Sequence, residues 1–113
     1  MSDRVQLQPI KRLHVRLGGV TVVDTAAAYV VRETGVPPRY YAPRREVRAT
    51  LEDTAEVGSC PWKGQWRHLD VTVEGTRVPA GAWTYDATTP VCEPIQGYVS
   101  FYAQKFDAIE VEV

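Results

Sequence analysis

The sequence predicts a mainly β domain with about eight short antiparallel strands and little helix, arranged as a sandwich or a curled sheet. Two observations carry this prediction. Apolar and polar residues alternate with a period of two in several short runs, as they do in strands with one buried face. Turn signals such as Gly18-Gly19 and Glu74-Gly75 separate these runs. The length of 113 residues suits one domain over residues 1–113, with its core at about 13–113 and a lead-in at 1–12.

The first expected strands form a hairpin, because residues 13–17 alternate in polarity, Gly18-Gly19 turns the chain and residues 20–24 return. Residues 25–33 are ambiguous: their alanines favour helix, whereas Tyr29-Val30-Val31 favours strand. We favour a strand, because the run is short and lies between strands. The remaining strands are expected at residues 47–51, 65–73, 78–85, 98–102 and 109–113.

Other segments are predicted to be irregular. Val36-Pro37-Pro38 is expected to stop regular structure, and residues 43–46 suit one helical turn with Pro43 at its first position. Residues 52–59 and 86–97 are expected to be loops, the first of them acidic. Pro79 and Gly81 predict a bulge or an edge position for the strand at 78–85.

Charge and composition narrow the class of protein. The formal net charge of −1 argues against a general nucleic-acid-binding protein. No apolar run approaches the roughly 20 residues that span a bilayer, and the first residues lead into no apolar signal region, so we expect a cytoplasmic protein. The cysteines and histidines, Cys60, Cys92, His14 and His68, have no metal-like spacing, so we expect neither a metal nor a cofactor. A homodimer is left open.

The segment 32–45 is the first candidate for function. It contains three prolines, four arginines and two adjacent tyrosines, and prolines restrict the conformations of a loop. Fixed arginines such as Arg39 and Arg44 suit the bidentate capture of a carboxylate or phosphate. Glu33 and Tyr41 would add polar contacts. The alternative is that the arginines are solvated surface charges and the tyrosines cover the core.

The second candidate is Cys60-Pro61-Trp62-Lys63-Gly64, where a thiol, a large aromatic and an amine share one tight turn. Lys63 could lower the pKa of Cys60 and favour the thiolate, but a catalytic thiol also needs a base. The alternative is structural: Cys60 as a small buried hydrophobe and Trp62 as a core anchor.

Aromatic residues are dense in the second half of the chain. The simplest explanation is that these aromatic residues pack in the core, and the more specific alternative is that they wall a ligand pocket. Trp83 and Tyr85 would share one strand face. The sequence has no glycine-rich phosphate loop, no Gly-x-Ser-x-Gly elbow, and no Gly-Ser followed by paired acids as two-metal nucleotide transfer requires.

Four ordered motifs resemble a known family. They are residues 33–41 (ETGVPPRYY), 60–64 (CPWKG), 82–85 (AWTY) and 97–102 (GYVSFY). Together they are similar to the bacterial domain of unknown function 427, sometimes labelled nucleotidyltransferase-like, over roughly residues 13–107. The resemblance implies a β-tent fold, in which two sheets meet at an angle, shared with methionine sulfoxide reductase B and the thalidomide-binding domain of cereblon. It also implies a form without the paired cysteines that hold zinc in several relatives.

We therefore expect a small-molecule-binding domain, or an enzyme without a cofactor, that takes a small polar or anionic ligand in a cleft lined by aromatics and arginine. The expected ligand-binding residues are Glu33, Arg39, Tyr41, Arg44, Trp62, Lys63, Trp83 and Tyr85. A thiol-dependent enzyme using Cys60, with Lys63 and Glu33 as further catalytic candidates, is one alternative. A protein-interaction domain with exposed aromatics is the other.

Overall fold

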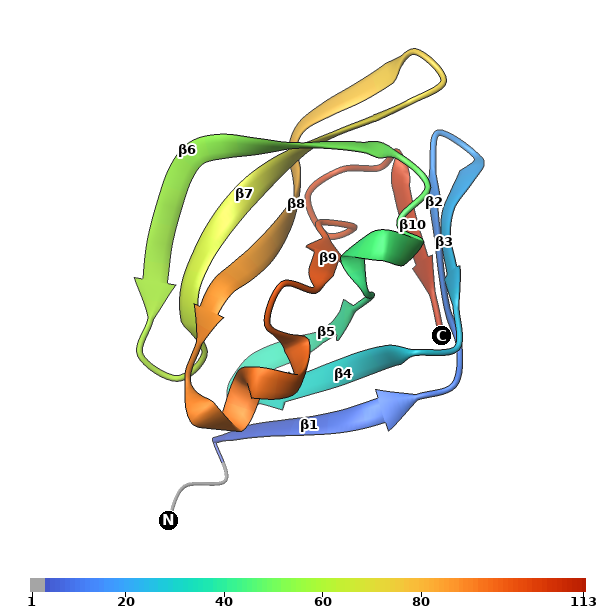
Figure 1. Cartoon of the computed structure of the whole chain (residues 1–113). Helices are drawn as coiled ribbons and strands as arrows, with labels where there is room; N and C mark the ends of the chain where they lie inside the picture. The colour runs from blue at the N-terminus through green and yellow to red at the C-terminus, as the bar shows by residue number, and fades with distance from the viewer. Residues whose placement is uncertain (1–3) are drawn as a thin grey trace.

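The computed structural model describes residues 4–113, which form a mainly β structure with two short 3-10 helices and no α-helix (Figure 1). The ten strands are β1 (Val5–Ile10), β2 (Leu13–Leu17), β3 (Val20–Thr25), β4 (Ala28–Glu33), β5 (Val36–Tyr41), β6 (Thr50–Cys60), β7 (Gly64–Val73), β8 (Thr76–Thr88), β9 (Val99–Phe101) and β10 (Ile109–Glu112). The 3-10 helices are η1 (Arg44–Glu46) and η2 (Pro90–Ile95). The predicted fold class is confirmed, and so is the single helical turn after Pro43.

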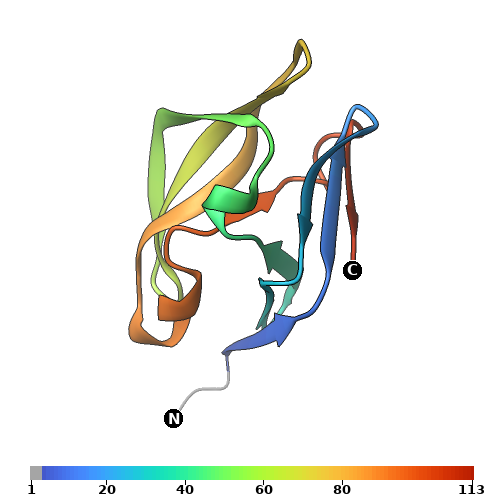
Figure 2. The ribbon, with the colours of Figure 1, turned by 45° about the vertical axis from the view of Figure 1, so that its right-hand side comes forward.

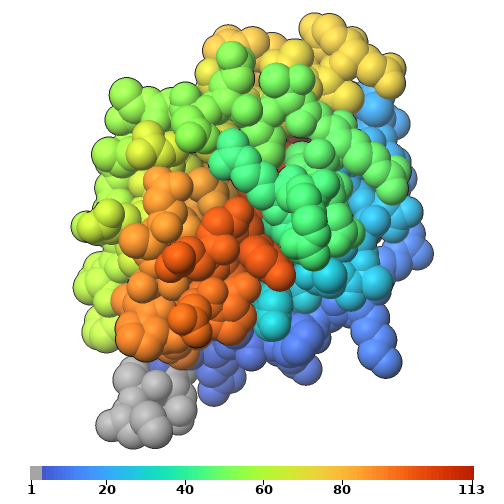
Figure 3. Space-filling view, in the orientation of Figure 1, coloured from blue at the N-terminus to red at the C-terminus, as the bar shows by residue number. Residues whose placement is uncertain are grey.

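The strands pair antiparallel in three small sheets rather than the two expected, with the orders β1-β4-β5, β10-β2-β3 and β6-β7-β8-β9. Figure 2 shows the four-stranded sheet on one side, β2, β3 and β10 on the other, and β1, β4 and β5 joining them below. A core cluster with members on β2, β3, β7 and β8, including Leu13, Val22 and Leu69, fills the space between the facing sheets. On the face seen in Figure 3, the green segment with η1 and the orange segment with η2 cover this interior.

Two of the strands lie where the sequence predicts irregular chain. β5 contains Pro37 and Pro38, which remove two backbone donors, but it is the edge strand of its sheet and its register with β4 shifts at this point. β6 covers the predicted acidic loop at 52–59, and it too is an edge strand, where exposed charges are the ordinary protection against unwanted pairing. In this protein the prolines of β5 and the charged residues of β6 therefore indicate edge strands of the sheets rather than loops.

β1 lies in the segment expected to be a lead-in. Its register with β4 pairs Val5 with Glu33 and Leu7 with Val31, so the strand forms the outer edge of the sheet that carries Glu33. The alternation of Val5 and Leu7 with Gln6 and Gln8 was the signal that the sequence offered for this strand.

The bulge expected near Pro79 and Gly81 is present. The register of β7 with β8 shifts between Leu69 and Val71, and Ala80 has a positive φ of 52°. The side chain of Asp70 holds the distortion, because its Oδ1 accepts a hydrogen bond from the Ala80 backbone N–H at 2.8 Å. The bulge bends β8 so that its second half, Ala82 to Tyr85, is buried.

Candidate functional site

A cleft of about 320 Å³ opens between the sheet β1-β4-β5 and the sheet β6-β7-β8-β9. Six parts of the chain supply its lining: the end of β4, β5, the β6–β7 turn, β7, β8 and the segment after β9. The residues that line it are Glu33, Val36, Arg39, Lys63, Trp66, Trp83, Tyr85 and Tyr102. The two sequence segments singled out for function therefore meet, with one contributing Glu33 and Arg39 and the other Lys63.

An ion pair closes one end of the cleft. Lys63 Nζ lies 2.8 Å from Glu33 Oε1, and each side chain is only 10% exposed. The same ammonium group lies 5.7 Å from the ring centroid of Tyr85, within reach of a cation–π interaction. In Figure 1 the β6–β7 turn and the arrowhead of β4, which carry the two charges, lie together at the lower left.

The turn that presents Lys63 depends on glycine. Gly64 has φ +130°, and a Cβ at this position would overlap the backbone carbonyl of Ala87 on β8. The Lys63 backbone is held on both sides, because its N–H donates to the Cys60 carbonyl and its own carbonyl accepts from the Thr89 N–H. Lys63 is thus fixed by its backbone as well as by its ion pair.

Aromatic rings form the wall and the floor of the cleft. Trp83 and Tyr102 lie with ring centroids 4.2 Å apart, and Trp66 packs on His68 at 4.8 Å. Tyr41 lies underneath, completely buried, where its hydroxyl accepts a hydrogen bond from Trp83 Nε1–H at 3.1 Å. Burial raises the pKa of Tyr41, and it also raises the pKa of Tyr85. Tyr41 therefore supports the aromatic wall and does not itself reach the cleft.

A hydrogen-bonded chain leads away from the cleft through Tyr102. The Tyr102 hydroxyl lies 2.9 Å from His68 Nε2, and His68 Nδ1 is hydrogen-bonded to Glu56 Oε1. A carboxylate only accepts, so Nδ1 carries a proton, and in the neutral imidazole Nε2 accepts the Tyr102 proton. Burial raises the pKa of Tyr102, an effect that nearby Arg39 opposes.

Arg39 is the charged residue lining the cleft that has no charged partner there. Of the three charged lining residues, Glu33 and Lys63 neutralise each other. Within residues 4–113, the Arg39 guanidinium has neither an ion-pair partner nor a side-chain hydrogen bond. The cleft therefore carries one uncompensated positive charge beside its aromatic wall.

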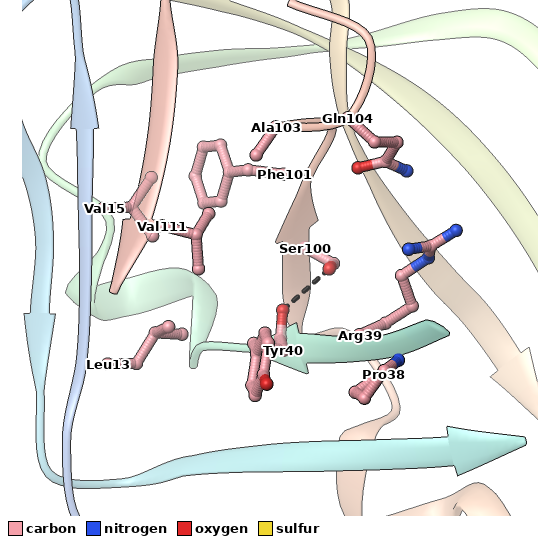
Figure 4. A pocket seen from close by; sticks show the side chains of 10 residues that line it. All are labelled: Leu13, Val15, Pro38, Arg39, Tyr40, Ser100, Phe101, Ala103, Gln104 and Val111. Carbon is pink, nitrogen blue, oxygen red and sulfur yellow. Dashed lines mark hydrogen bonds between the residues drawn. The ribbon is translucent and has the colours of Figure 1, made fainter. Parts of the chain in front are cut away.

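A second hollow of about 210 Å³ shares Arg39 with the cleft and is lined mostly by apolar residues. Figure 4 shows Val15, Phe101 and Val111 gathered on one side of it, with Arg39 and Gln104 on the other. The Ser100 hydroxyl is already engaged there, since it donates to the Tyr40 carbonyl at 2.7 Å. Arg39 thus lines both hollows, and among the described residues it is the one charged side chain that lines the second.

Three of the expected ligand-binding residues do not line the cleft: Tyr41, which lies behind its wall, Arg44 and Trp62. Arg44 is on η1 and pairs with Asp53 at 3.1 Å. Trp62 is 41% exposed at the tip of the β6–β7 turn, with the Arg4 guanidinium 4.4 Å from its ring. The structure brings Glu33, Arg39, Lys63, Trp83 and Tyr85 together at the cleft, with Tyr41 behind them.

The partners that the thiol hypothesis needs are engaged elsewhere. Lys63 is bound to Glu33, and His68 is bound to Glu56 and Tyr102. Cys60 is partly buried and packs against the aromatic cluster. Burial raises the pKa of Cys92, which is fully buried in the same cluster.

Four residues of this site were not among the sequence-predicted ones: Trp66, Tyr102, His68 and Glu56. The alternation along β7 did place Trp66 and His68 on one face, away from Leu69 and Val71. The sequence did not indicate that His68 would contact Tyr102, because Tyr102 lies 34 positions further along the chain.

Among residues 4–113, no helix is long and apolar enough to cross a bilayer. No group of three or more His, Cys, Asp or Glu side chains in the same range is arranged to hold a metal ion. No curated protein matches the chain significantly. A family model described as a domain of unknown function (DUF427) matches residues 6–112, almost the whole chain and all of the cleft, so the chain belongs to the DUF427 family.

Proposed function

We propose that this domain binds a small organic anion with a flat unsaturated part, which lies against Trp83 and Tyr102 while its carboxylate or phosphate contacts Arg39. The observation that carries the proposal is the unpaired Arg39 guanidinium beside an aromatic wall. An arginine in a partly enclosed cleft without an anionic partner gains most from a ligand that supplies one.

The remaining polar groups of the cleft suit specific binding of a small molecule rather than non-specific apolar association. The pair of Glu33 and Lys63 presents both a donor and an acceptor at one end of the cleft, already fixed in position. A few placed polar groups in an otherwise aromatic concave site are typical of small-molecule sites. The volume of about 320 Å³ lies at the small end of such sites, which favours a ligand of metabolite size.

Benzoate is a suitable first probe, because it combines a planar ring with one carboxylate. Its binding is measured by the quenching of tryptophan fluorescence and by the rise in melting temperature, with benzyl alcohol as the uncharged control. We expect Arg39→Ala to weaken benzoate binding by roughly tenfold to a hundredfold, the range for a lost hydrogen bond to a charged group. Because Arg39 is partly exposed and unpaired, the free energy of unfolding should change by less than about 1 kcal/mol.

Arg45→Ala is the matched control, since Arg45 is a strongly exposed arginine outside the cleft. Arg44→Ala tests the other expected arginine. If Arg39→Ala and Arg45→Ala bind benzoate equally well, or if benzoate and benzyl alcohol bind alike, the anion site is not at Arg39.

A further inference from the structure

The chain of hydrogen bonds behind the cleft joins a carboxylate, an imidazole and a phenol. Glu56 on β6 binds His68 Nδ1 on β7, and His68 Nε2 binds the hydroxyl of Tyr102, which follows β9. The imidazole is held in this orientation, because its ring packs on Trp66 at 4.8 Å and meets the Tyr102 ring edge-on at 5.4 Å. The His68 side chain is only 12% exposed, whereas Tyr102 lines the cleft.

A phenol held this way has its hydroxyl within hydrogen-bond reach of a base, while its side chain lines the cleft. Burial raises the pKa of Tyr102, and nearby Arg39, which lines the same cleft, opposes this effect. A second cation lies close to the ring, with Lys105 Nζ 4.2 Å from its centroid. Glu56 favours the imidazolium that results when His68 takes the proton. A hydroxyl, a base within hydrogen-bond reach and a third group that orients the base form the general arrangement of an activated hydroxyl.

We propose that Tyr102 is an acid–base residue of the cleft, with His68 as the base that takes its proton and Glu56 as the positioning residue. In the forward step the Tyr102 oxygen takes a proton from an O–H or activated C–H of the bound molecule, while the Tyr102 proton passes to His68 Nε2. One proton leaves the bound molecule and one arrives on the imidazole, so Tyr102 is unchanged. The ligand's new negative charge forms near Arg39, and the imidazolium charge faces Glu56.

This inference rests on the proposed function for placing a molecule in the cleft, and it deepens that function from binding to proton abstraction. The groups that face His68 and Tyr102 are Glu56 from β6, Arg39 from β5 and Lys105 beyond β9, so any pH response of the pair must be read with these charges. Since burial raises the pKa of Tyr102, the hydroxyl depends on His68 for activation.

The test uses benzenesulfonyl fluoride on the whole protein, with labelled tyrosines identified by mass spectrometry. The Tyr102 oxygen attacks the sulfur, fluoride leaves and the phenolic proton goes to His68. An ordinary tyrosine reacts as its phenolate, so its labelling rate rises roughly tenfold per pH unit until about pH 10. For Tyr102 we expect measurable labelling already near neutral pH, where an ordinary tyrosine hardly reacts, because His68 Nε2 lies 2.9 Å from the hydroxyl and can take its proton. Partly exposed Tyr40 is the internal control.

Two variants separate a proton acceptor from a merely structural histidine. His68→Gln should return Tyr102 to the ordinary steep pH profile, and Glu56→Gln should slow its labelling near neutral pH, because the imidazole loses the carboxylate that orients it. If His68→Gln fails to fold, the Glu56→Gln profile decides alone, because Glu56 is exposed. A Tyr102 that labels with the same pH profile as Tyr40, or not at all, overturns the proposal. No ligand is needed, so failure here is separate from failure of benzoate to bind.

Discussion

The ion pair between Lys63 and Glu33 offers a direct measure of how far the cleft is withdrawn from water. The change is Lys63→Met, which keeps most of the side-chain stem and removes the ammonium group. In the structure this leaves Glu33, only 10% exposed, without the partner that lies 2.8 Å away. The cation–π contact with Tyr85 is lost at the same time.

The expected cost follows from burial. Removing one member of a buried pair costs about 3–5 kcal/mol, because the remaining charge stays desolvated, whereas an exposed pair is worth about 0–1 kcal/mol. The cation–π contact adds about 0.5–1 kcal/mol. For a domain of this size, a loss of 3 kcal/mol corresponds to a fall in melting temperature of roughly 10–20 °C.

The assay is urea unfolding followed by tryptophan fluorescence, in a double-mutant cycle of Lys63→Met, Glu33→Met and the double variant. We expect each single variant to lose several kcal/mol and the double variant to recover much of that loss, since two apolar side chains can replace a buried pair at little cost. If Lys63→Met costs less than about 1 kcal/mol and the two changes are additive, the pair is solvated and the cleft is more open than the structure shows.

Two other expectations concern stability. Gly64→Ala should lower the free energy of unfolding by more than about 2 kcal/mol in urea, because the added Cβ would meet the Ala87 carbonyl at a strained φ. Gly75→Ala is the control: the turn there has open space, so it should cost only about 1 kcal/mol. If the two variants lose the same stability, the steric argument for Gly64 is refuted. Burial raises the pKa values of Tyr41, Tyr85 and Tyr102 above the ordinary value of 10.0, so the folded state keeps protons that the unfolded state releases, and stability should fall as the pH rises above about 10. Spectrophotometric titration at 295 nm, in which all six tyrosines ionise together near pH 10 without unfolding, would contradict this.

Local sequence was a good guide where the pairing is local. The hairpin of β2 and β3 follows from alternation around Gly18-Gly19, and the pairing of β7 with β8 turns at Glu74-Gly75. These contacts join neighbours along the chain, so their strands and turn are specified by the same few residues. The sequence-based predictions of irregular chain at β5 and β6 were wrong for the same reason. Proline and charge are unfavourable in central strands and acceptable at edges, and the order of strands in a sheet is not visible in the sequence.

The sequence by itself determined the β class, the local hairpins and a set of suitable residues in two segments, because alternation and turn chemistry depend on near neighbours. Only the tertiary structure decided which of those residues meet. Lys63 contacts Glu33 across 30 positions and His68 contacts Tyr102 across 34, through the packing of separate sheets. Arg39 and Arg44 look alike in the sequence, but Asp53 on the next strand neutralises Arg44 and no carboxylate of the described chain does the same for Arg39. The physical reason is that a side chain's charge and exposure are set by long-range contacts, and these follow from strand order and register.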